Sequence, residues 1–372
     1  MLKIGITGQE GFVGTHLYNT LNLFPEEYCC IDYNISYFSN DTQLDDFVSK
    51  CDVIVHLAAM NRHNDPDVIY NTNIQLVEKL IASLERSKST AHVLFSSSSQ
   101  EERDNPYGRS KKEGRKLLEK WASKNGGSIT GLIIPNVFGP FGHPNYNSVV
   151  ATFSHQISHG ETPEIEVDGE LKLIYVGELV LKIIEKAKEQ KNESLYHVPH
   201  TATAKVSEIL NLLKKYKEEY QDRGEIPTIK TSFELNLFNT YRCYMDIKNH
   251  FPVKFTQHTD SRGSFVEIIR LGVGGQVSFS TTVPGITRGN HYHTRKIERF
   301  AVIKGRALIQ LRKIGTDEVL DFYLDGDEPA YVDMPIWYTH NIKNIGDEIL
   351  YTNFWINELY NAEDADTFFE EV

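Results

Sequence analysis

The feature that most constrains the fold is a glycine-spaced turn between an apolar strand and a helix at the start of the chain. Residues 2–7 read as a buried strand, and residues 12–23 read as a helix. The segment Thr7-Gly-Gln-Glu-Gly-Phe-Val-Gly14 joins them and places glycines at positions 8, 11 and 14. Such glycines let the backbone approach an anion and let the helix pack closely on the strand. This arrangement is typical of the first unit of a parallel α/β sheet that binds a dinucleotide.

The rest of the chain divides into two patterns. Further strands are expected at residues 28–32, 51–57, 92–96 and 129–134, and helices at 68–85, 106–123, 146–158, 176–190 and 207–220. This alternation predicts a parallel doubly wound sheet. Short strands punctuated by Gly, Pro and Asp follow over residues 251–351 and predict an all-β sandwich or barrel. We therefore expect an α/β domain over residues 1–245 and an all-β domain over residues 246–372.

Composition and charge exclude several classes of protein. The chain has 372 residues, 40% of them hydrophobic, and no low-complexity run, which indicates globular domains. A net charge of −12 opposes non-specific binding to nucleic acid. No apolar run approaches the ~20 residues of a membrane span. The four cysteines lack metal or disulfide spacing, and a strand from Leu2 leaves no room for a leader. We expect a cytoplasmic protein that contacts neither nucleic acid nor membrane.

Residues for proton transfer follow the glycine turn. Tyr107 and Lys111 are four positions apart on an expected helix, so they share one face. A nearby ammonium stabilises a phenolate and eases proton transfer from the phenol. The run Ser96–Ser99 at a strand end could hold a substrate carbonyl. Asp32 ends the second strand and could bind a ribose while repelling a 2′-phosphate, which favours NAD, or it could simply be a polar strand end.

These motifs resemble those of the extended short-chain dehydrogenases/reductases. The resemblance covers roughly residues 1–240 and includes Asp52-Val-Ile-Val-His-Leu-Ala-Ala59 and Pro135-Asn-Val-Phe-Gly-Pro140. It implies a Rossmann-like fold in which Ser98, Tyr107 and Lys111 are catalytic and Asn73 supports them. The implied cofactor contacts are Gly8, Gly11, Phe12, Val13, Gly14, Asp32, Leu57, Ala58, Ala59 and Lys111, and the implied sugar-nucleotide contacts are Asn136, Asn145 and Asn147.

The chain departs from this family at two places. Ile133 and Ile134 stand where an Arg is frequent before the Pro-Asn motif. The usual Val-Asp-Asp is Val176-Gly177-Glu178. Both departures concern substrate contacts and leave the hydride chemistry unaffected.

A second candidate site lies in the all-β part. His291, His293, Glu298 and His340 are ligand types that suit a divalent metal. A His-x-His pair on a strand places both imidazoles on one face. One such pair could be two surface histidines, but the set of four predicts a metal site. We expect zinc, and the same ligands would accept iron, manganese or nickel.

The spacing of these ligands resembles the two motifs of the cupin superfamily, with Trp337 where a Gly is usual. The segments Asp260-Ser-Arg-Gly-Ser-Phe-Val-Glu267 and Arg288-Gly-Asn-His291 are similar to dTDP-4-keto-6-deoxysugar 3,5-epimerases. That likeness implies His291 as the catalytic base. Since His291 is also an expected metal ligand, the identity of the base stays open. The implied nucleotide and phosphate contacts are Arg262, Phe265, Glu267 and Arg288, although both arginines could be plain surface cations.

As a whole the chain resembles a family of capsular polysaccharide-synthesis enzymes that join a reductase domain to a cupin domain. Residues 104–111, 144–149 and 285–291 carry that resemblance. It implies that the cupin domain epimerises C3 of a UDP-4-keto-6-deoxy-N-acetylhexosamine. The reductase domain would then reduce C4 with NADPH to UDP-N-acetyl-6-deoxy-L-talosamine, on the route to UDP-N-acetyl-L-fucosamine. It also implies a homodimer, and NADH stays possible because of Asp32.

Two other interpretations are open. One is a single-step nucleotide-sugar 4-reductase whose cupin domain is structural and dimerising. The other is a non-catalytic sensor with a vestigial nucleotide fold. The intact Tyr107 and Lys111 count against the sensor.

Overall fold

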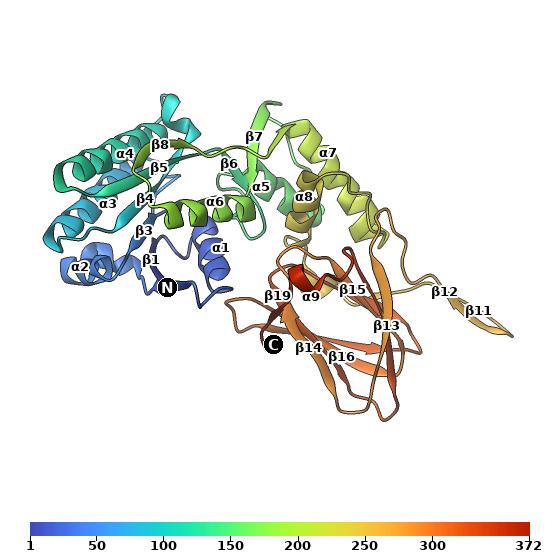
Figure 1. Ribbon diagram of the computed structural model, residues 1–372. Coiled ribbons are helices and arrows are strands. Elements are labelled where there is room, and N and C mark those ends of the chain that lie inside the picture. Colours follow the sequence, from blue (N-terminus) through green and yellow to red (C-terminus); the bar gives the residue numbers. More distant parts are fainter. The chain divides into compact units, whose positions relative to one another are not determined.

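The computed structural model describes residues 1–372 and divides into two compact units (Figure 1). Unit 1 comprises Met1–Thr152 and Val167–Val206, and unit 2 comprises Phe153–Glu166 and Ser207–Val372. The predicted boundary at 245/246 lies within unit 2. No helix combines the length and apolar character needed to cross a membrane.

Unit 1 is built on a six-stranded parallel sheet of order β2-β1-β3-β4-β5-β8. This confirms the predicted doubly wound sheet. The strand order reverses between β1 and β3, which is where such sheets bind ligands. Strands β6, β7 and β9 form a smaller mixed sheet. The strands are β1 (Leu2–Thr7), β2 (Tyr28–Ile31), β3 (Val53–His56), β4 (His92–Ser98), β5 (Ser128–Ile134), β6 (Asn136–Phe138), β7 (Glu170–Tyr175), β8 (Glu193–His197) and β9 (Ala202–Lys205).

Several helices of this part begin at side-chain caps. Helix α2 was not predicted; Asn40 caps it by accepting a hydrogen bond from the Gln43 amide. Helix α5 begins three residues later than predicted, after Ser148, whose hydroxyl oxygen accepts from the Ala151 amide at 3.4 Å. The helices are α1 (Phe12–Leu21), η1 (Ile35–Ser39), α2 (Asp41–Ser49), α3 (Pro66–Arg86), η2 (Ser99–Glu102), α4 (Pro106–Asn125), α5 (Val149–Ser158), which passes from unit 1 into unit 2, and α6 (Val176–Glu189).

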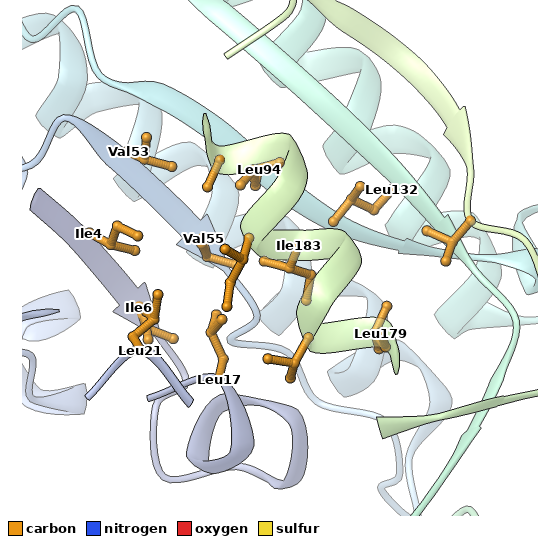
Figure 2. Packing of buried hydrophobic residues seen from close by; sticks show 14 of the residues in the cluster. Ile4, Ile6, Leu17, Leu21, Val53, Val55, Leu94, Leu132, Leu179 and Ile183 are labelled. Atoms are coloured by element: carbon orange, nitrogen blue, oxygen red, sulfur yellow. The ribbon is translucent and has the colours of Figure 1, made fainter. Parts of the chain in front are cut away.

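Apolar side chains cover both faces of the parallel sheet. On one face Ile6, Val55 and Leu94 pack against α1 and α6, as Figure 2 shows. On the other face Ile54 and Val93 pack against α2, α3 and α4. A sheet buried on both faces explains why its strands are continuous apolar runs.

Unit 2 contains two antiparallel sheets of order β10-β18-β15-β20-β13 and β17-β16-β19-β14-β21. Val302 and Val332 of the first sheet share one core with Ile309 and Ile342 of the second. This confirms the predicted all-β fold. The strands are β10 (Val253–Lys254), β11 (Gln257–Asp260), β12 (Gly263–Val266), β13 (Gln276–Thr282), β14 (Thr287–Tyr292), β15 (Glu298–Lys304), β16 (Arg306–Lys313), β17 (Val319–Asp325), β18 (Ala330–Met334), β19 (Tyr338–Asn344), β20 (Leu350–Ile356) and β21 (Phe368–Phe369).

Helical segments precede the sheets of unit 2. Helix α8 was not predicted, although Thr231, which caps it by accepting from the Glu234 amide, begins a recognisable Thr-x-x-Glu signal. The segments are α7 (Val206–Tyr216), the π-helical η3 (Lys217–Asp222), α8 (Ser232–Arg242), α9 (Ile247–His250) and, near the C-terminus, η4 (Ala362–Asp364).

Candidate functional site

The glycine turn lies at the switch point of the parallel sheet. Gly8 has φ +77°, and a Cβ there would lie 2.8 Å from the Ala58 amide nitrogen after β3. A Cβ on Gly14 would lie 2.2 Å from the Gly8 carbonyl oxygen, so only glycine lets α1 approach this turn. Gly11 precedes α1 without a side-chain cap, and the first turn, which starts with Phe12 and Val13, holds no acidic residue. An uncapped helix N-terminus that follows a glycine turn and has no acidic residue in its first turn suits an anion such as a pyrophosphate.

The residues predicted to contact the adenosine end of a cofactor follow β2 and β3. Asp32 is exposed directly after this strand, and Leu57, Ala58 and Ala59 follow β3. Tyr33 was not predicted as a site residue. Its hydroxyl is buried beside the backbone of Gly8, and burial raises the pKa of Tyr33 to about 12. A tyrosine after a strand carries no sequence signal for such a position.

Tyr107 and Lys111 lie in the first two turns of α4. Asn105 caps this helix by accepting from the Gly108 amide at 2.7 Å. Lys111 is 3% exposed, and its Nζ donates to Ser96 Oγ at 3.4 Å and lies 5.6 Å from the centre of the Tyr107 ring. Burial lowers the pKa of Lys111 to about 7 and raises the pKa of Tyr107. The structure thus brings the predicted proton-transfer pair together beside the end of β4.

The serines at the end of β4 have different partners. Ser96 faces Lys111, and Ser98 lies on the same side of the strand because alternate residues share a face. Ser98 Oγ accepts from the Gln100 amide at 3.1 Å and so caps η2. Ser97 instead donates to buried Glu101. Only Ser96 and Ser98 therefore face the proton-transfer side.

Asn73 connects two segments near the predicted catalytic residues by hydrogen bonds. It is 4% exposed, accepts from the Met60 amide at 2.7 Å and donates to the Met60 carbonyl at 3.0 Å. Its Nδ2 also donates to Ser110 Oγ at 3.0 Å. Asn73 therefore ties the loop after β3 to helix α4.

The predicted sugar-nucleotide residues are distributed over two places. Asn136 is exposed in β6 and donates to the Lys172 carbonyl at 3.1 Å. Asn145 and Asn147 are exposed in the loop before α5. Arg62, which was not predicted, donates to the carbonyls of Asn145 and Tyr146 at 2.9 and 3.1 Å. The loop after β3 is therefore joined to the loop that holds Asn145 and Asn147.

The departure at Glu178 has a structural explanation. Its carboxylate accepts from the Tyr175 amide at 3.3 Å and from the Thr201 hydroxyl. Glu178 therefore caps the start of α6.

The four predicted metal ligands converge in unit 2. His291 lies on β14, His293 follows this strand, Glu298 begins β15 and His340 lies on β19. One ligand atom of each lies within 4.8 Å of the others. Glu298 Oε2 is 3.1 Å from His293 Nε2 and 3.2 Å from His340 Nε2. Two neighbouring imidazole nitrogens and one carboxylate oxygen at such distances form a typical donor set for a transition metal.

Electrostatics and outer contacts fit a cation at this position. Burial acts to raise the pKa of Glu298, but the hydrogen bond from His293 and the nearby His340 ring hold that pKa well below its usual range. Burial and the neighbouring His340 lower the pKa of His291 to about 4. The Nδ1 atoms of His293 and His340 face the carbonyls of Asp366 and Tyr338, which leaves both Nε2 atoms for a ligand. His340 Nε2 is buried without a well-aligned hydrogen bond. The residues therefore fit zinc, which they would hold by three nitrogens and one oxygen.

Unusual backbone geometry supports this convergence. The pairing of β14 with β19 shifts register between Gly289 and His291, with φ of +99° at Gly289 and +60° at Asn290. Trp337, which replaces the usual cupin glycine, has φ +61° and donates its amide to the His293 carbonyl at 2.8 Å. The chain therefore keeps a left-handed turn at this place with a large side chain on it.

The structure does not bring the predicted epimerase contacts to the metal ligands. Arg262 pairs with Asp260 at 2.6 Å inside the β11–β12 hairpin, which forms a separate sheet (Figure 1). Phe265 of the same hairpin is 69% exposed. Glu267, directly after the hairpin, pairs with Arg270. Only Arg288 shares a strand with a proposed ligand, and it donates to the Thr281 carbonyl at 3.5 Å.

Comparison with known proteins identifies the family to which the chain belongs. The NAD dependent epimerase/dehydratase family matches residues 4–197, just over half of the chain, and the polysaccharide biosynthesis C-terminal domain matches residues 258–368. The capsular polysaccharide assembling protein CapF from Staphylococcus aureus is 35% identical, with a TM-score of 0.63 and all of both chains covered. The chain belongs to the CapF-type family.

Other relatives show how far the CapF-type likeness extends. A UDP-2-acetamido-2,6-beta-L-arabino-hexul-4-ose reductase from Pseudomonas aeruginosa is 31% identical over 99% of this chain and 98% of its own length. The spore coat polysaccharide biosynthesis protein SpsL from Bacillus subtilis is 27% identical over 30% of this chain. A UDP-N-acetylglucosamine 4-epimerase from Bacillus cereus is 17% identical over 65% of this chain, with a TM-score of 0.54, and shows the fold alone. The CapF-type resemblance therefore spans both units.

Proposed function

We propose that this CapF-type protein is a bifunctional nucleotide-sugar enzyme with a reductase site in unit 1 and an epimerase site in unit 2. The observation that carries the reductase is the buried Lys111 beside Tyr107, at the carboxyl end of a parallel sheet whose glycine turn suits a pyrophosphate. The Pseudomonas aeruginosa relative named as a UDP-4-ketosugar reductase supports this class of substrate. The C4 ketone of a UDP-4-keto-6-deoxy-N-acetylhexosamine is the proposed group to be reduced, to UDP-N-acetyl-6-deoxy-L-talosamine.

The residues of unit 1 supply the proton in this reduction. NADPH, when bound, supplies the hydride that adds to C4. Tyr107 donates its phenolic proton to the ketone oxygen, so that the carbonyl becomes an alcohol. The Lys111 ammonium stabilises the phenolate that remains, and Ser98 donates a hydrogen bond to the ketone oxygen.

The choice of NADPH follows the family resemblance. Asp32 is exposed after β2, so its carboxylate can turn away from a 2′-phosphate. An acid at this position favours a free ribose, which keeps NADH as a second possible cofactor.

The residues of unit 2 are proposed to invert C3 before the reduction. A proton on the carbon next to a ketone is acidic because the carbanion delocalises into an enolate. Zinc, when bound by the four ligands, supplies positive charge that stabilises the enolate oxygen. A base takes the C3 proton, and an acid on the other face returns a proton to C3. The ketone is thereby restored, so the same sugar is then a substrate for unit 1.

A homodimer is part of this proposal. Phe265, Val277 and Phe279 are 69%, 54% and 70% exposed on β12 and β13. Val277 and Phe279 share one face of β13, an edge strand, whereas Phe265 lies on the separate β11–β12 hairpin. Exposed apolar side chains of this size suit contact with a second copy. The predicted nucleotide contact Arg262 lies on the same exposed hairpin.

Solvent exchange separates the two steps. The ketosugar is incubated with the protein in deuterated water without cofactor, and NMR then follows deuterium at C3. Incorporation supports the epimerase site. A protein that reduces the ketosugar with NADPH but incorporates no deuterium is a single-step reductase, and the all-β part is then structural.

A further inference from the structure

Residues near the C-terminus bond to His293 and pair with or bond to the strands that hold His291 and His340. We propose that Asp366 is a positioning residue of the metal site and that residues 361–371, the C-terminal strap, fix its geometry. This inference rests on the metal site proposed above. It assigns a role to a segment that carries no ligand itself.

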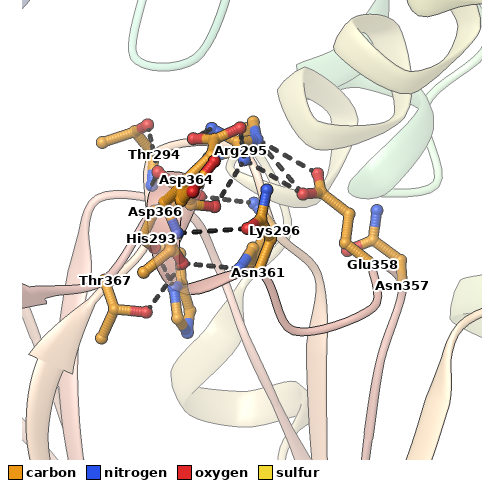
Figure 3. A network of polar contacts seen from close by, with 12 residues as sticks. His293, Thr294, Arg295, Lys296, Asn357, Glu358, Asn361, Asp364, Asp366 and Thr367 are labelled. Carbon is orange, nitrogen blue, oxygen red and sulfur yellow. Dashed lines mark hydrogen bonds and ion pairs between the residues drawn. The ribbon is translucent and has the colours of Figure 1, made fainter.

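Asp366 anchors the loop between His293 and Glu298. Its side chain is 6% exposed, and its carboxylate accepts four hydrogen bonds from this loop, as Figure 3 shows. Oδ1 accepts from the Thr294 amide at 3.1 Å and from Thr294 Oγ1 at 2.6 Å. Oδ2 accepts from the amides of Arg295 and Lys296 at 3.1 and 3.2 Å. Three consecutive backbone amides are thus held by one carboxylate.

The same residue orients the His293 ring. His293 Nδ1 lies 2.5 Å from the main-chain carbonyl oxygen of Asp366, to which it donates. This bond holds a proton on Nδ1, so that a metal would take the place of the Nε2 proton, which faces Glu298. The Asp366 side chain fixes the loop while its carbonyl fixes the imidazole. The position of Asp366 therefore determines where His293 Nε2 points.

The rest of the C-terminal strap reaches the neighbours of two other ligands. Strand β21 pairs with β14 so that Phe369 lies opposite His291. The Glu370 amide donates to the Asn290 carbonyl at 3.1 Å. The Glu370 carbonyl accepts from the hydroxyl of Thr339, which precedes His340. The strap therefore fixes the backbone on both sides of the bulge in β14 and at the start of β19.

Two features of Asp366 each cost folding free energy. Its φ is +42°, a conformation that Gly or Asn adopts more easily. Its carboxylate is also buried, which is costly for a charge. A glycine at this position would adopt the positive φ more easily and would bury no charge. Four converging donors and the bond to His293 give a reason to keep Asp.

The test compares metal release from full-length variants loaded with zinc. Asp366→Asn keeps the size and tolerates the backbone conformation, but its NH2 group faces the donors that the carboxylate accepted. Glu363→Gln, three residues earlier and exposed, is the control with the same change of charge. Release of zinc to a coloured chelator should be about 10-fold faster or more for Asp366→Asn and unchanged for the control. The cobalt-loaded Asp366→Asn protein should also show altered d–d absorption bands.

A milder variant keeps the inference testable if Asp366→Asn does not fold. Thr294→Val deletes only the 2.6 Å hydrogen bond and should release zinc about threefold faster. Equal release rates and equal cobalt spectra for Asp366→Asn and Glu363→Gln would overturn the role of Asp366, as would a wild-type rate for Thr294→Val. A wild-type protein that holds neither metal overturns the metal site itself, which is a different result from variants that do not differ.

Discussion

Lys111 in unit 1 and Glu298 in unit 2 are both buried charged groups, but their surroundings differ. Lys111 donates to a neutral hydroxyl, and burial alone lowers its pKa to about 7. Glu298 lies among imidazoles, and the hydrogen bond from His293 and the nearby His340 ring outweigh burial and keep its pKa low. A buried ammonium without a carboxylate partner can stabilise the phenolate that forms when a tyrosine gives up its proton. A carboxylate among imidazoles suits a site in which several side chains bind one metal cation.

The two sites also differ in how their residues are held. Tyr107 and Lys111 share one helix face, so local periodicity alone brings them together. Three of the metal ligands lie on three different strands, and His293 follows one of them. A bulge, three residues with positive φ and the C-terminal strap hold these segments together. The first site can therefore tolerate distant changes better than the second.

The substitution with the largest expected effect distinguishes reduction at C4 from proton exchange at C3. Tyr107→Phe removes the proton donor and should lower the rate of ketosugar reduction by about 10²- to 10⁴-fold. Deuterium exchange at C3 should continue at the wild-type rate because Tyr107 takes no part in it. NADPH oxidation and NMR on the same sample measure both. Loss of exchange together with reduction would show that the two sites are not separate.

Removal of a metal ligand is expected to have the next largest effect. His293→Ala deletes one of the four converging ligands and should weaken zinc binding by more than about 100-fold, because even changes outside the ligands cost 10- to 100-fold. Metal analysis of the purified protein measures this. His258→Ala, an exposed histidine of the β11–β12 hairpin, is the control. Equal zinc content in both variants would contradict the proposed ligand set.

The pH dependence of reduction tests the state of Lys111. Its pKa of about 7 means that the ammonium loses its proton as the pH rises through this value. A neutral amine no longer stabilises the phenolate, so kcat/KM for reduction should fall up to about 10-fold between pH 6 and pH 8. Lys111→Arg stays charged over this range and should lose this fall, at a lower overall rate. The same profile in both proteins would assign the titration to another group.

The smallest expected effect concerns the cofactor. Asp32→Ala removes the carboxylate that opposes a 2′-phosphate and should raise the NADPH-to-NADH preference by about threefold to tenfold. Initial rates with each cofactor measure it. Glu26→Ala, an exposed acid before β2, is the control. An unchanged preference would place Asp32 away from the ribose.

Much of unit 1 could be predicted from the sequence because its signals are local. Three glycines between a strand and a helix specify the turn, and a spacing of four specifies the helix face of Tyr107 and Lys111. The prediction missed α2, which has few apolar residues, and α8, although its Thr231 cap signal and its apolar residues are local features of the sequence. The serine that contacts Lys111 could not be chosen from the run, since all four have the same chemistry.

The types and spacing of residues determined the doubly wound sheet, the all-β part and the set of His291, His293, Glu298 and His340. They could do so because side-chain periodicity and ligand chemistry are properties of short segments. Only the tertiary structure decided that the hairpin with Arg262 forms a separate sheet and that Asp366 lies under His293, 73 residues away. Contacts between such distant residues depend on how strands pair and where the chain returns, and no local pattern encodes them.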